Sequence, residues 1–384
     1  MLQTFSLHKY LLECGYDAVV LNKFGLPNED ECKYLINNIF RLRGGCRFIL
    51  GCLNFSGMFC QLIKEIRLNK WLRDNIIWSV ESGFNDSFPA RSIRDGIIIV
   101  GSDQVWNPAY PTLAYYLLGE FSDNVVKIAF SASFGTNKFP KESVGLYKSR
   151  LEQFDAISVR ESSAVGIIKD MFGLVSEHVC DPTLLHTREE WNCLLGIDKS
   201  VKTCGVMMYF VTYDFRLLWR AAVGVAWKSK KKVHCFAMVK SELVPIFNFR
   251  NPLLGVYELG KNIAKRLILF CSGVRLHFAA TPTEFVKMVA SCDGLVTDSF
   301  HGMMFATIYE KPLNVVIGSH PQRLQMSTRL KDFLSDFGDV SILTEVPDLT
   351  RMKVLKVTPQ LGELVEKSKA WLKDAISIRR DCHE

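Results

Sequence analysis

The sequence lacks the features that would assign it to several common classes of protein. It has no stretch of eighteen uninterrupted apolar residues, so we expect no membrane-spanning helix. No signal peptide opens the chain, and its 12 cysteines form neither a CxxC pair nor a regular framework, which predicts reduced thiols in a cytoplasm. The net charge of +7 includes no run of five like charges, so nucleic acid is not expected as a partner.

Sequence motifs for bound cofactors are missing as well. No GxGxxG or Walker loop follows a predicted strand, so neither a dinucleotide nor a P-loop nucleotide is supported. No HExxH motif or Cys/His cluster indicates a metal, and no GxSxG elbow indicates a hydrolase. We therefore expect a protein without a resident cofactor or metal.

The segments that are present indicate a large α/β protein. The chain has 384 residues and is 48% hydrophobic, which is enough for one large domain or two of ordinary size. A continuous β-branched run, typical of a buried parallel strand, occurs at 97–100. Similar apolar runs alternate with helical patterns and predict further strands at 126–130, 156–159, 205–211, 232–239 and 294–297.

We expect the chain to divide near residue 190. This gives an N-terminal domain at 1–190, a C-terminal domain at 191–350, and a C-terminal segment at 351–384 whose amphipathic helix packs back across the junction. A helix opens the chain and a predicted strand at 17–21 follows it, which is an unusual start for an α/β domain. The sequence therefore suggests that a first strand and its loop are missing.

The stretch at 293–318 carries the strongest chemical signal. It predicts a strand, a tight turn, a helix N-capped by Ser299, and another strand from Val315. His301 and Gly302 would lie in the first helical turn, where amides and the helix dipole attract an anion and Gly302 allows close approach. A lone histidine more often only packs or caps. The Asp-Ser before it and the Gly after it, at a strand's carboxyl end, favour a functional role.

Polar side chains also follow three other predicted strands. Asp103 follows the strand at 97–100, which makes it a candidate site residue or, equally, a helix cap. Ser131 and Ser133 follow the next strand and could hold phosphate or sugar hydroxyls, or merely form a turn. Arg160 follows the strand after that, and its planar guanidinium fits carboxylate or phosphate. A surface pair between Arg160 and Glu161 is the alternative.

More cationic side chains follow the central stretch. His320, Arg323 and Arg329 lie on a polar loop and the helix predicted after it. The two arginines could be counter-charges for an anion bound near His301. On a solvated helix they would be commonplace.

Taken in order, four motifs resemble those of the polysaccharide pyruvyl transferase family, and the resemblance covers essentially the whole chain. They are GSDQVWN at 101–107, AFSASFG at 129–135, ISVRE at 157–161 with DPT at 181–183, and DSFHG at 298–302. MLQTFSL at 1–7 resembles the family's first helix. The family's preceding strand and Asn-Tyr-Gly-like loop have no counterpart in this sequence.

The resemblance implies two Rossmann-like domains in a GT-B-like arrangement, with the site in the interdomain cleft. It implies that phosphoenolpyruvate, a co-substrate, gives its pyruvyl group to a sugar diol as a ketal during bacterial capsule or exopolysaccharide synthesis. The family's donor-contacting histidine corresponds to His301, and the arginine of its Val-Arg-Glu motif corresponds to Arg160.

The residue types fit this chemistry independently. One group must exchange protons near neutrality, which suits the imidazole of His301, and Asp103 is the expected base toward the acceptor hydroxyl. The donor carries two anionic groups, so it needs cations, amides and hydroxyls. We expect these from Arg160, Ser299, Phe300, Gly302, Arg329, Ser131 and Ser133.

The expected acceptor is a glycan. A lipid-linked repeat unit at the inner face of the membrane suits the family, and the basic region at 41–73 would suit peripheral contact with that membrane. The expected location is therefore the cytoplasm, at or near that face.

Two other interpretations stay open. A GT-B glycosyltransferase with a nucleotide-sugar donor would use the same cleft, and a histidine at a helix start could face its diphosphate. A sugar or phosphate binder that has lost activity belongs to a different class. Intact His301, Arg160 and Asp103 argue against that class, whereas the missing first strand argues for it.

Overall fold

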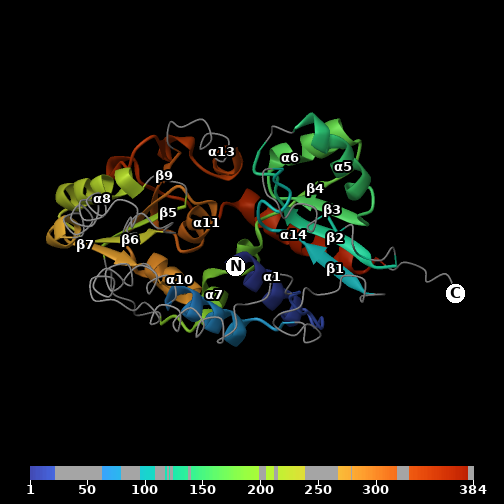
Figure 1. Ribbon diagram of the computed structural model, residues 1–384, viewed down its shortest axis with the longest axis horizontal. Helices are drawn as coiled ribbons and strands as arrows, with labels where there is room; N and C mark the ends of the chain where they lie inside the picture. Colours follow the sequence, from blue (N-terminus) through green and yellow to red (C-terminus); the bar gives the residue numbers. More distant parts are fainter. Residues whose placement is uncertain are drawn as a thin grey trace, which may run out of the picture.

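The computed structural model contains two β-sheets with helices packed around them (Figure 1). Most of the predicted basic region at 41–73 lies outside the described residues, as do His320 and Arg323. The described residues are 1–21, 63–78, 96–108, 117–118, 121, 124–136, 140–198, 205–211, 215–237, 267–277, 279–317 and 328–378.

In the described part of the chain, the first sheet has four parallel strands in the order β1-β2-β3-β4. These strands are β1 (Ile97–Val100), β2 (Val126–Ala132), β3 (Ala156–Val159) and β4 (Glu177–His178). Every residue of β2 is buried, as expected of a central parallel strand. Helices α5 (Lys141–Leu151) and α6 (Ser162–Ile167) share a hydrophobic core with these strands.

The second sheet is larger, and its described strands run in the order β10-β9-β8-β5-β6-β7, all parallel. A short strand, β11, pairs antiparallel with β9. The strands are β5 (Val206–Phe210), β6 (Val233–Ala237), β7 (Val274–His277), β8 (Gly294–Thr297), β9 (Pro312–Val316), β10 (Leu343–Thr344) and β11 (Lys353–Val354). The helices of this half include α8 (Phe215–Ser229), α10 (Pro282–Ser291), α11 (Phe300–Ile308) and α13 (Thr328–Phe337).

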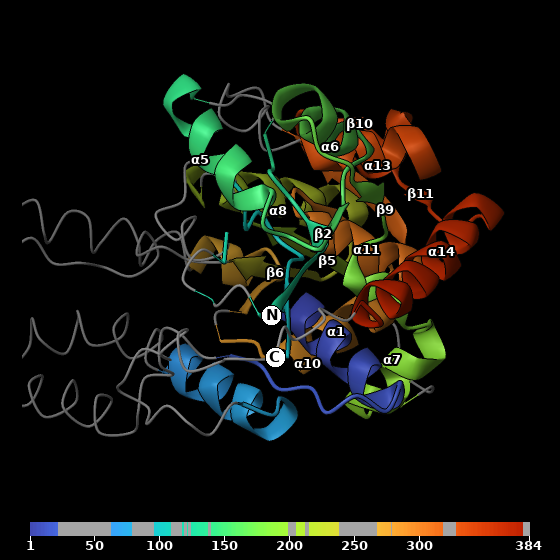
Figure 2. The ribbon, with the colours of Figure 1, turned by 90° about the vertical axis from the view of Figure 1, so that its right-hand side faces the viewer.

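Helices α1 (Leu2–Glu13), α7 (Arg188–Leu195) and α14 (Pro359–Ile376) lie where the two halves meet (Figures 1 and 2). One hydrophobic core contains Phe130 of β2 and Leu295 of β8, and Phe5 of α1 belongs to it as well. The ring of Phe5 packs on that of Trp191 in α7, with centroids 5.9 Å apart. The first helix therefore helps to hold the two halves together.

Helix α14 follows the second sheet in the chain but packs on the first. The ring of Trp371 stacks on Phe130 of β2 with centroids 6.1 Å apart, and the backbone amide of Cys180 donates to the Ser368 hydroxyl at 2.8 Å. The domain limits placed at residues 190 and 350 stay predictions.

Several element predictions can be compared directly with the structure. The strands predicted at 97–100, 156–159 and 294–297 begin and end as predicted. The strand predicted at 17–21 is wrong: the described backbone there forms an isolated bridge between Val20 and Trp78. Strand β9 begins at Pro312 and not at Val315, since a proline is tolerated as the first residue of a strand. Among the described helices, none combines the length and apolar character that crossing a bilayer requires.

Candidate active site

The turn between β8 and α11 is fixed by a chain of local hydrogen bonds. The Ser299 hydroxyl accepts the Gly302 amide at 3.3 Å, so the predicted N-cap of α11 is confirmed. Thr297 Oγ1 accepts the Ser299 amide at 3.0 Å and donates to the Tyr209 carbonyl at 2.5 Å on neighbouring β5. These bonds leave little freedom in the first turn of α11, from which His301 projects.

Gly302 is required here for a different reason from the one expected. A Cβ atom at this position would lie 2.7 Å from Thr297 Oγ1, so the missing side chain allows α11 to pack against its own strand. The Gly302 amide is already bonded to Ser299. Among the described residues, the amides of Phe300 and His301 have no acceptor, so these two first-turn amides are available to an anion.

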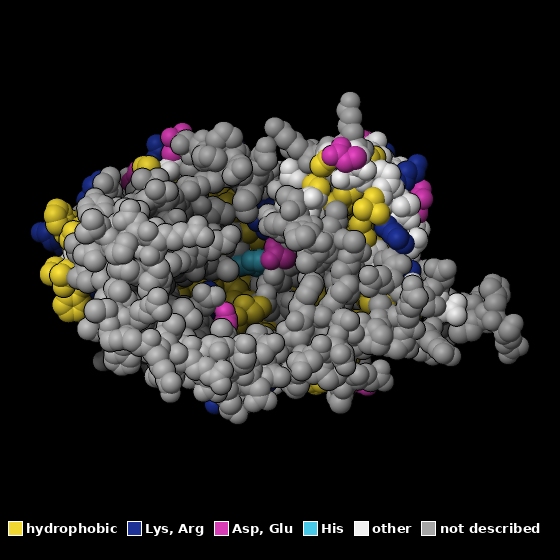
Figure 3. All heavy atoms as spheres, viewed as in Figure 1, with side chains coloured by type: hydrophobic (Ala, Val, Ile, Leu, Met, Phe, Trp, Pro, Cys, Tyr) yellow, Lys and Arg dark blue, Asp and Glu magenta, His cyan; other side chains and the backbone are white. Residues whose placement is uncertain are grey.

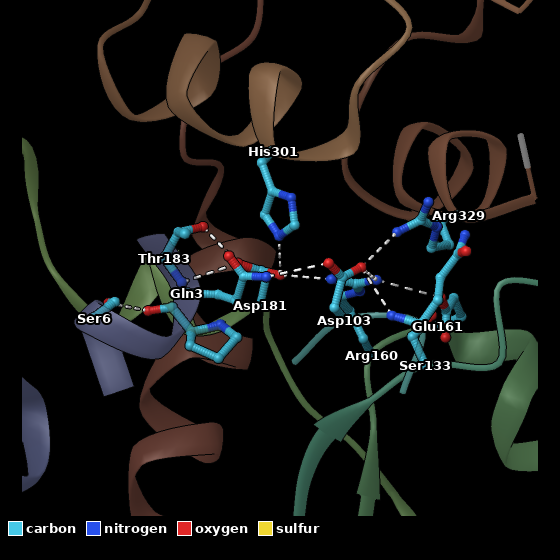
Figure 4. A network of polar contacts seen from close by, with 12 residues as sticks. Gln3, Ser6, Asp103, Ser133, Arg160, Glu161, Asp181, Thr183, His301 and Arg329 are labelled. Atoms are coloured by element: carbon cyan, nitrogen blue, oxygen red, sulfur yellow. Dashed lines mark hydrogen bonds and ion pairs between the residues drawn. The ribbon is translucent and has the colours of Figure 1, made fainter. Parts of the chain in front are cut away.

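Side chains of the first sheet meet His301 at the junction of the two halves (Figure 4). Asp103 comes from the carboxyl end of β1, and Arg160 comes from the carboxyl end of β3. Arg160 Nη2 lies 4.0 Å from Asp103 Oδ1, and Arg329 Nη1 of α13 lies 3.5 Å from the same oxygen. Asp103 is about half exposed, whereas the Arg160 side chain is buried. The structure therefore brings together His301, Asp103, Arg160 and Arg329.

Asp181 is the important residue that sequence reasoning did not assign to the site. Its Oδ2 lies 2.9 Å from Arg160 Nη1 and 3.6 Å from His301 Nε2, and its side chain is fully buried. Its Oδ1 accepts the amide and the hydroxyl of Thr183, at 2.9 and 2.6 Å. The Asp-Pro-Thr sequence indicates such a local cap, but no sequence pattern places the other oxygen against Arg160 and His301.

The ring of Phe300 contacts both arginines of the site. The Cζ atom of Arg160 lies 4.5 Å from the Phe300 ring centroid, and that of Arg329 lies 5.8 Å from it. Both distances are within the range of cation–π attraction. Phe300 is itself 5% exposed, and its contact with the donor stays a prediction.

The predicted donor-binding serines Ser131 and Ser133 lie inside the first half of the molecule. Both are fully buried, and Ser131 has a left-handed φ of 57° at the end of β2. The Ser133 hydroxyl donates a short hydrogen bond to Glu161. Their described contacts are structural, and donor contact stays a prediction for both. Glu161 is buried too, so the alternative of a surface pair between Arg160 and Glu161 is wrong.

The charged side chains of the site, together with burial, shift the pKa values of its carboxyl groups. Partial burial opposes the charge on Asp103, but His301, Arg160 and Arg329 outweigh it and lower the pKa of Asp103 to about 2. Complete burial likewise opposes the charge on Asp181, yet contact with His301 and Arg160 holds its pKa well below the ordinary value. Glu161 behaves in the opposite way, since burial raises its pKa despite Arg160 and Ser133 nearby. Asp103 and Asp181 are therefore carboxylates at neutral pH.

Asp103 accepts the amide of Gln104 at 2.8 Å within a turn, and residues 104–108 form no helix for it to cap. On its other side, Gln3 Nε2 of α1 donates to Asp103 Oδ2 at 3.3 Å. Gln3 is a further site residue that the sequence did not reveal. Its only sequence signal is its place in the opening helix.

Empty space adjoins the cluster on two sides. A small open pocket lies beside Arg329 and Glu161, between α6 and α13. Figure 3 shows histidine and acidic side chains in a hollow near the middle of the molecule, where α11 faces the first sheet in Figure 1. His301 is 21% exposed, so its ring can meet a ligand from solvent. Among the described residues, no group of His, Cys, Asp and Glu side chains is arranged to hold a metal ion.

Two largely parallel α/β sheets, with a charged site at the carboxyl ends of strands from both, define a pair of Rossmann-like domains in a GT-B-like arrangement. Comparison with protein families then gives a match to polysaccharide pyruvyl transferase over residues 1–320. The chain belongs to the polysaccharide pyruvyl transferase family, and it is accordingly a transferase.

Comparison with curated proteins gives no match. Among solved structures, the chain is similar to a UDP-GlcNAc 2-epimerase from Neisseria meningitidis bound to UDP-GlcNAc, with 9% identity, a TM-score of 0.44, and coverage of 97% of this chain and 90% of that one. A glycosyltransferase from Rickettsia africae gives 10% identity, a TM-score of 0.40, and coverage of 98% and 94%. A UDP-N-acetylglucosamine 2-epimerase from Rickettsia bellii gives 9% identity, a TM-score of 0.47, and coverage of 98% and 93%.

Proposed function

We propose that the protein transfers the pyruvyl group of phosphoenolpyruvate to two hydroxyls of a sugar, forming a pyruvate ketal. The observation that carries the proposal is the convergence of His301, Asp103, Arg160 and Arg329 between the two halves of the molecule. Family membership supplies the class of reaction. Phosphoenolpyruvate is a co-substrate, and no resident cofactor takes part.

The donor has a carboxylate and a phosphate, and the site has cations for both. Arg160 Nη2 and Arg329 Nη1 already face one carboxylate, that of Asp103. Because Asp103 is half exposed and Arg160 is buried, an anion entering from solvent meets Asp103 first. The donor's carboxylate takes the place of Asp103 between the two guanidinium groups. Its phosphate lies at the first turn of α11, where the amides of Phe300 and His301 and the helix dipole favour negative charge.

The reaction requires two proton transfers at opposite ends of the donor. His301 gives a proton to the methylene carbon, which becomes a methyl group, and the central carbon becomes an oxocarbenium ion. One sugar hydroxyl adds to that carbon and loses its proton to Asp103, freed from the arginines. The C–O bond to phosphate then breaks, and the second hydroxyl closes the ketal. The second hydroxyl's proton goes to the departing phosphate, and the proton held by Asp103 returns through solvent to His301, which restores both side chains.

Asp181 holds the proton donor in position for this step. Its carboxylate is fixed by Thr183 and Arg160, both in the first half of the molecule, whereas His301 belongs to the second half. His301 is therefore oriented by a residue from the opposite half.

A donor test distinguishes this function from a nucleotide-sugar glycosyltransferase. The purified protein is incubated with aryl or lipid-linked glycosides and either phosphoenolpyruvate or a nucleotide sugar. We expect one phosphate released per glycoside that gains the mass of a pyruvate ketal, and no reaction with the nucleotide sugar. Transfer from the nucleotide sugar alone would establish the glycosyltransferase, and tight binding of phosphoenolpyruvate without turnover would establish a binder.

The acceptor belongs to a surface polysaccharide under construction, such as a capsule or exopolysaccharide. We place the reaction in the cytoplasm at the inner face of the membrane, where lipid-linked repeat units are available. Support comes from family membership, which implies a polysaccharide acceptor. A faster reaction with a lipid-linked glycoside than with the same free glycan would support this placement.

A further inference from the structure

Large apolar side chains are exposed together at the outer end of the second half of the molecule. Trp227 near the end of α8 is 72% exposed, and Phe270, in the helical segment at 267–271, is 81% exposed. Leu267 and Ile268 of the same segment are 59% and 43% exposed. Figure 3 shows hydrophobic side chains gathered at this end, with basic ones beside them. Tryptophan and phenylalanine are costly to leave in water, so such a patch marks an interaction surface.

Internal packing shows that these side chains belong to one surface. Leu269, between the exposed residues of its segment, is buried in a core that also contains Ala222, Val225 and Ala226 of α8. The loops after the two helices are joined as well, because the Val233 amide donates to the Gly273 carbonyl. Trp227 and Phe270 therefore project from neighbouring helices that form one rigid unit.

Lysines surround this apolar patch. Lys228, Lys230 and Lys232 follow Trp227 directly, and all three are exposed. Lys231, between them, pairs with Asp293 at 2.8 Å. Hydrogen bonds with Thr350 lower the pKa of Asp348, and the charge of Lys228 adds to this effect, so one carboxylate lies near this lysine. Exposed Arg275 in β7 adds a further positive charge. The surface thus combines exposed aromatic rings with an excess of positive charge.

We propose that this surface, consisting of Trp227, Leu267, Ile268, Phe270 and the lysines at 228–232, docks on an anionic lipid bilayer. Aromatic side chains favour the boundary between headgroups and acyl chains, and flexible lysines neutralise acidic headgroups. Each lysine near an anionic surface strengthens binding by about fivefold. The protein is held at the membrane by these side chains.

The position of the surface leaves the active site open. The lysine loop and the loop at 271–273 precede β6 and β7, so they lie at the amino edge of the second sheet. His301 follows β8, which is parallel to these strands, and therefore lies at the opposite, carboxyl edge. Docking then tethers the enzyme without covering its site. This inference is independent of the proposed reaction.

Sedimentation with vesicles tests the proposal. The full chain is mixed with phosphatidylcholine vesicles that contain or lack phosphatidylglycerol, at low and high salt. We expect sedimentation with the phosphatidylglycerol vesicles at low salt and loss of binding at high salt or without the anionic lipid. The double variant Lys230→Glu/Lys232→Glu should bind at least about 25-fold more weakly, since two attractions of about fivefold are lost. Trp227→Ser/Phe270→Ser should also lose binding.

Matched controls come from the first half of the molecule. Lys148→Glu/Lys169→Glu makes the same charge change at exposed positions, and Val175→Ser removes an apolar side chain that is 87% exposed. Both controls should bind vesicles like the unchanged protein, and all variants should keep their circular dichroism. Absence of binding to anionic vesicles, or equal binding by test and control variants, would overturn the proposal. Concentration-dependent self-association that Trp227→Ser/Phe270→Ser abolishes, without vesicle binding, would assign the surface to a second copy of the chain instead.

Discussion

At the scale of single residues, the site depends on a carboxylate that both halves share. Asp181 is fully buried and faces Arg160, so its charge compensates a guanidinium that has almost no access to water. Removing one member of a buried pair is costly because the other is left uncompensated. Asp103 faces the same arginine at 4.0 Å but is half exposed, so water can replace it.

We therefore predict that Asp181→Asn lowers the free energy of unfolding by on the order of 3 kcal/mol, whereas Asp103→Asn lowers it by less than about 1 kcal/mol. Both variants should lose transferase activity. Urea denaturation followed by fluorescence measures the first effect, and turnover with phosphoenolpyruvate measures the second. Equal stability losses in the two variants would contradict the assigned burial and pairing.

Glu161 gives a prediction about pH. Burial raises its pKa, so the folded protein binds this proton more tightly than the unfolded chain does. The contribution of Glu161 to stability is then present below the ordinary glutamate pKa and is lost as pH rises through the raised value. The contribution of Asp103 to stability has the opposite pH dependence, because its pKa is lowered. It is lost only as pH falls toward about 2.

We predict that Glu161→Gln makes the free energy of unfolding less dependent on pH between about 4.5 and neutrality, because glutamine cannot ionise. Urea denaturation of Glu161→Gln and of the unchanged protein at several pH values gives the free energy of unfolding of each as a function of pH. The difference between the two free energies of unfolding should change steadily over this pH window. A constant difference would mean that Glu161 titrates normally.

At the scale of elements, the N-cap of α11 fixes the turn from which the His301 ring projects. Ser299 caps α11 and Thr281 caps α10 by the same kind of hydrogen bond, each at 3.3 Å. We predict that Ser299→Ala and Thr281→Ala each lower the free energy of unfolding by about 1 kcal/mol. Only Ser299→Ala should also reduce turnover, by about tenfold or more, because it loosens the turn that carries His301. Similar turnover in both variants would show that the cap has no catalytic consequence.

The sequence predicted these elements where local signals were strong. A β-branched run located β1, an apolar run located β3, and the predicted cap at Ser299 located the start of α11. The error at 17–21 arose because a strand needs a partner, and the partner is not visible in the segment itself. A local sequence pattern indicates whether a segment favours helix or strand. Whether a strand finds a pairing partner depends on other parts of the chain.

The candidate site residues were also predicted where local signals sufficed and missed where distant segments meet. His301, Asp103, Arg160 and Arg329 were found from their places after strands or near a helix start, and the fold brings them together. The contacts of Asp181 and Gln3 could not be found in this way, because each depends on segments about a hundred residues apart or more meeting in space. The role of Gly302 was also missed, since its contact with Thr297 appears only once the turn is built.

At the scale of the whole molecule, the chain's last described helix links the two halves. Leu372 of α14 is fully buried in the core that contains residues of both sheets. We predict that Leu372→Ala lowers the free energy of unfolding by about 2–5 kcal/mol, through lost burial and the cavity left behind. Lys373→Ala, at the exposed neighbouring position, should change it by about 0.5 kcal/mol or less. Urea denaturation measures both, and a Leu372→Ala variant as stable as Lys373→Ala would contradict this role for α14.

The central claim is that His301 gives the proton that starts pyruvyl transfer. The His301 side chain is 21% exposed, and its buried Nε2 faces Asp181 at 3.6 Å without a hydrogen bond, so His301→Gln, which keeps a polar group there, should leave the fold intact. The most direct measurement is ketal formation by His301→Ala and His301→Gln with phosphoenolpyruvate and a glycoside acceptor, together with calorimetry of donor binding. We predict that both variants fold and bind the donor but form ketal at least about 10²–10⁴-fold more slowly than the unchanged protein. Ketal formation at the original rate in either variant would contradict the account.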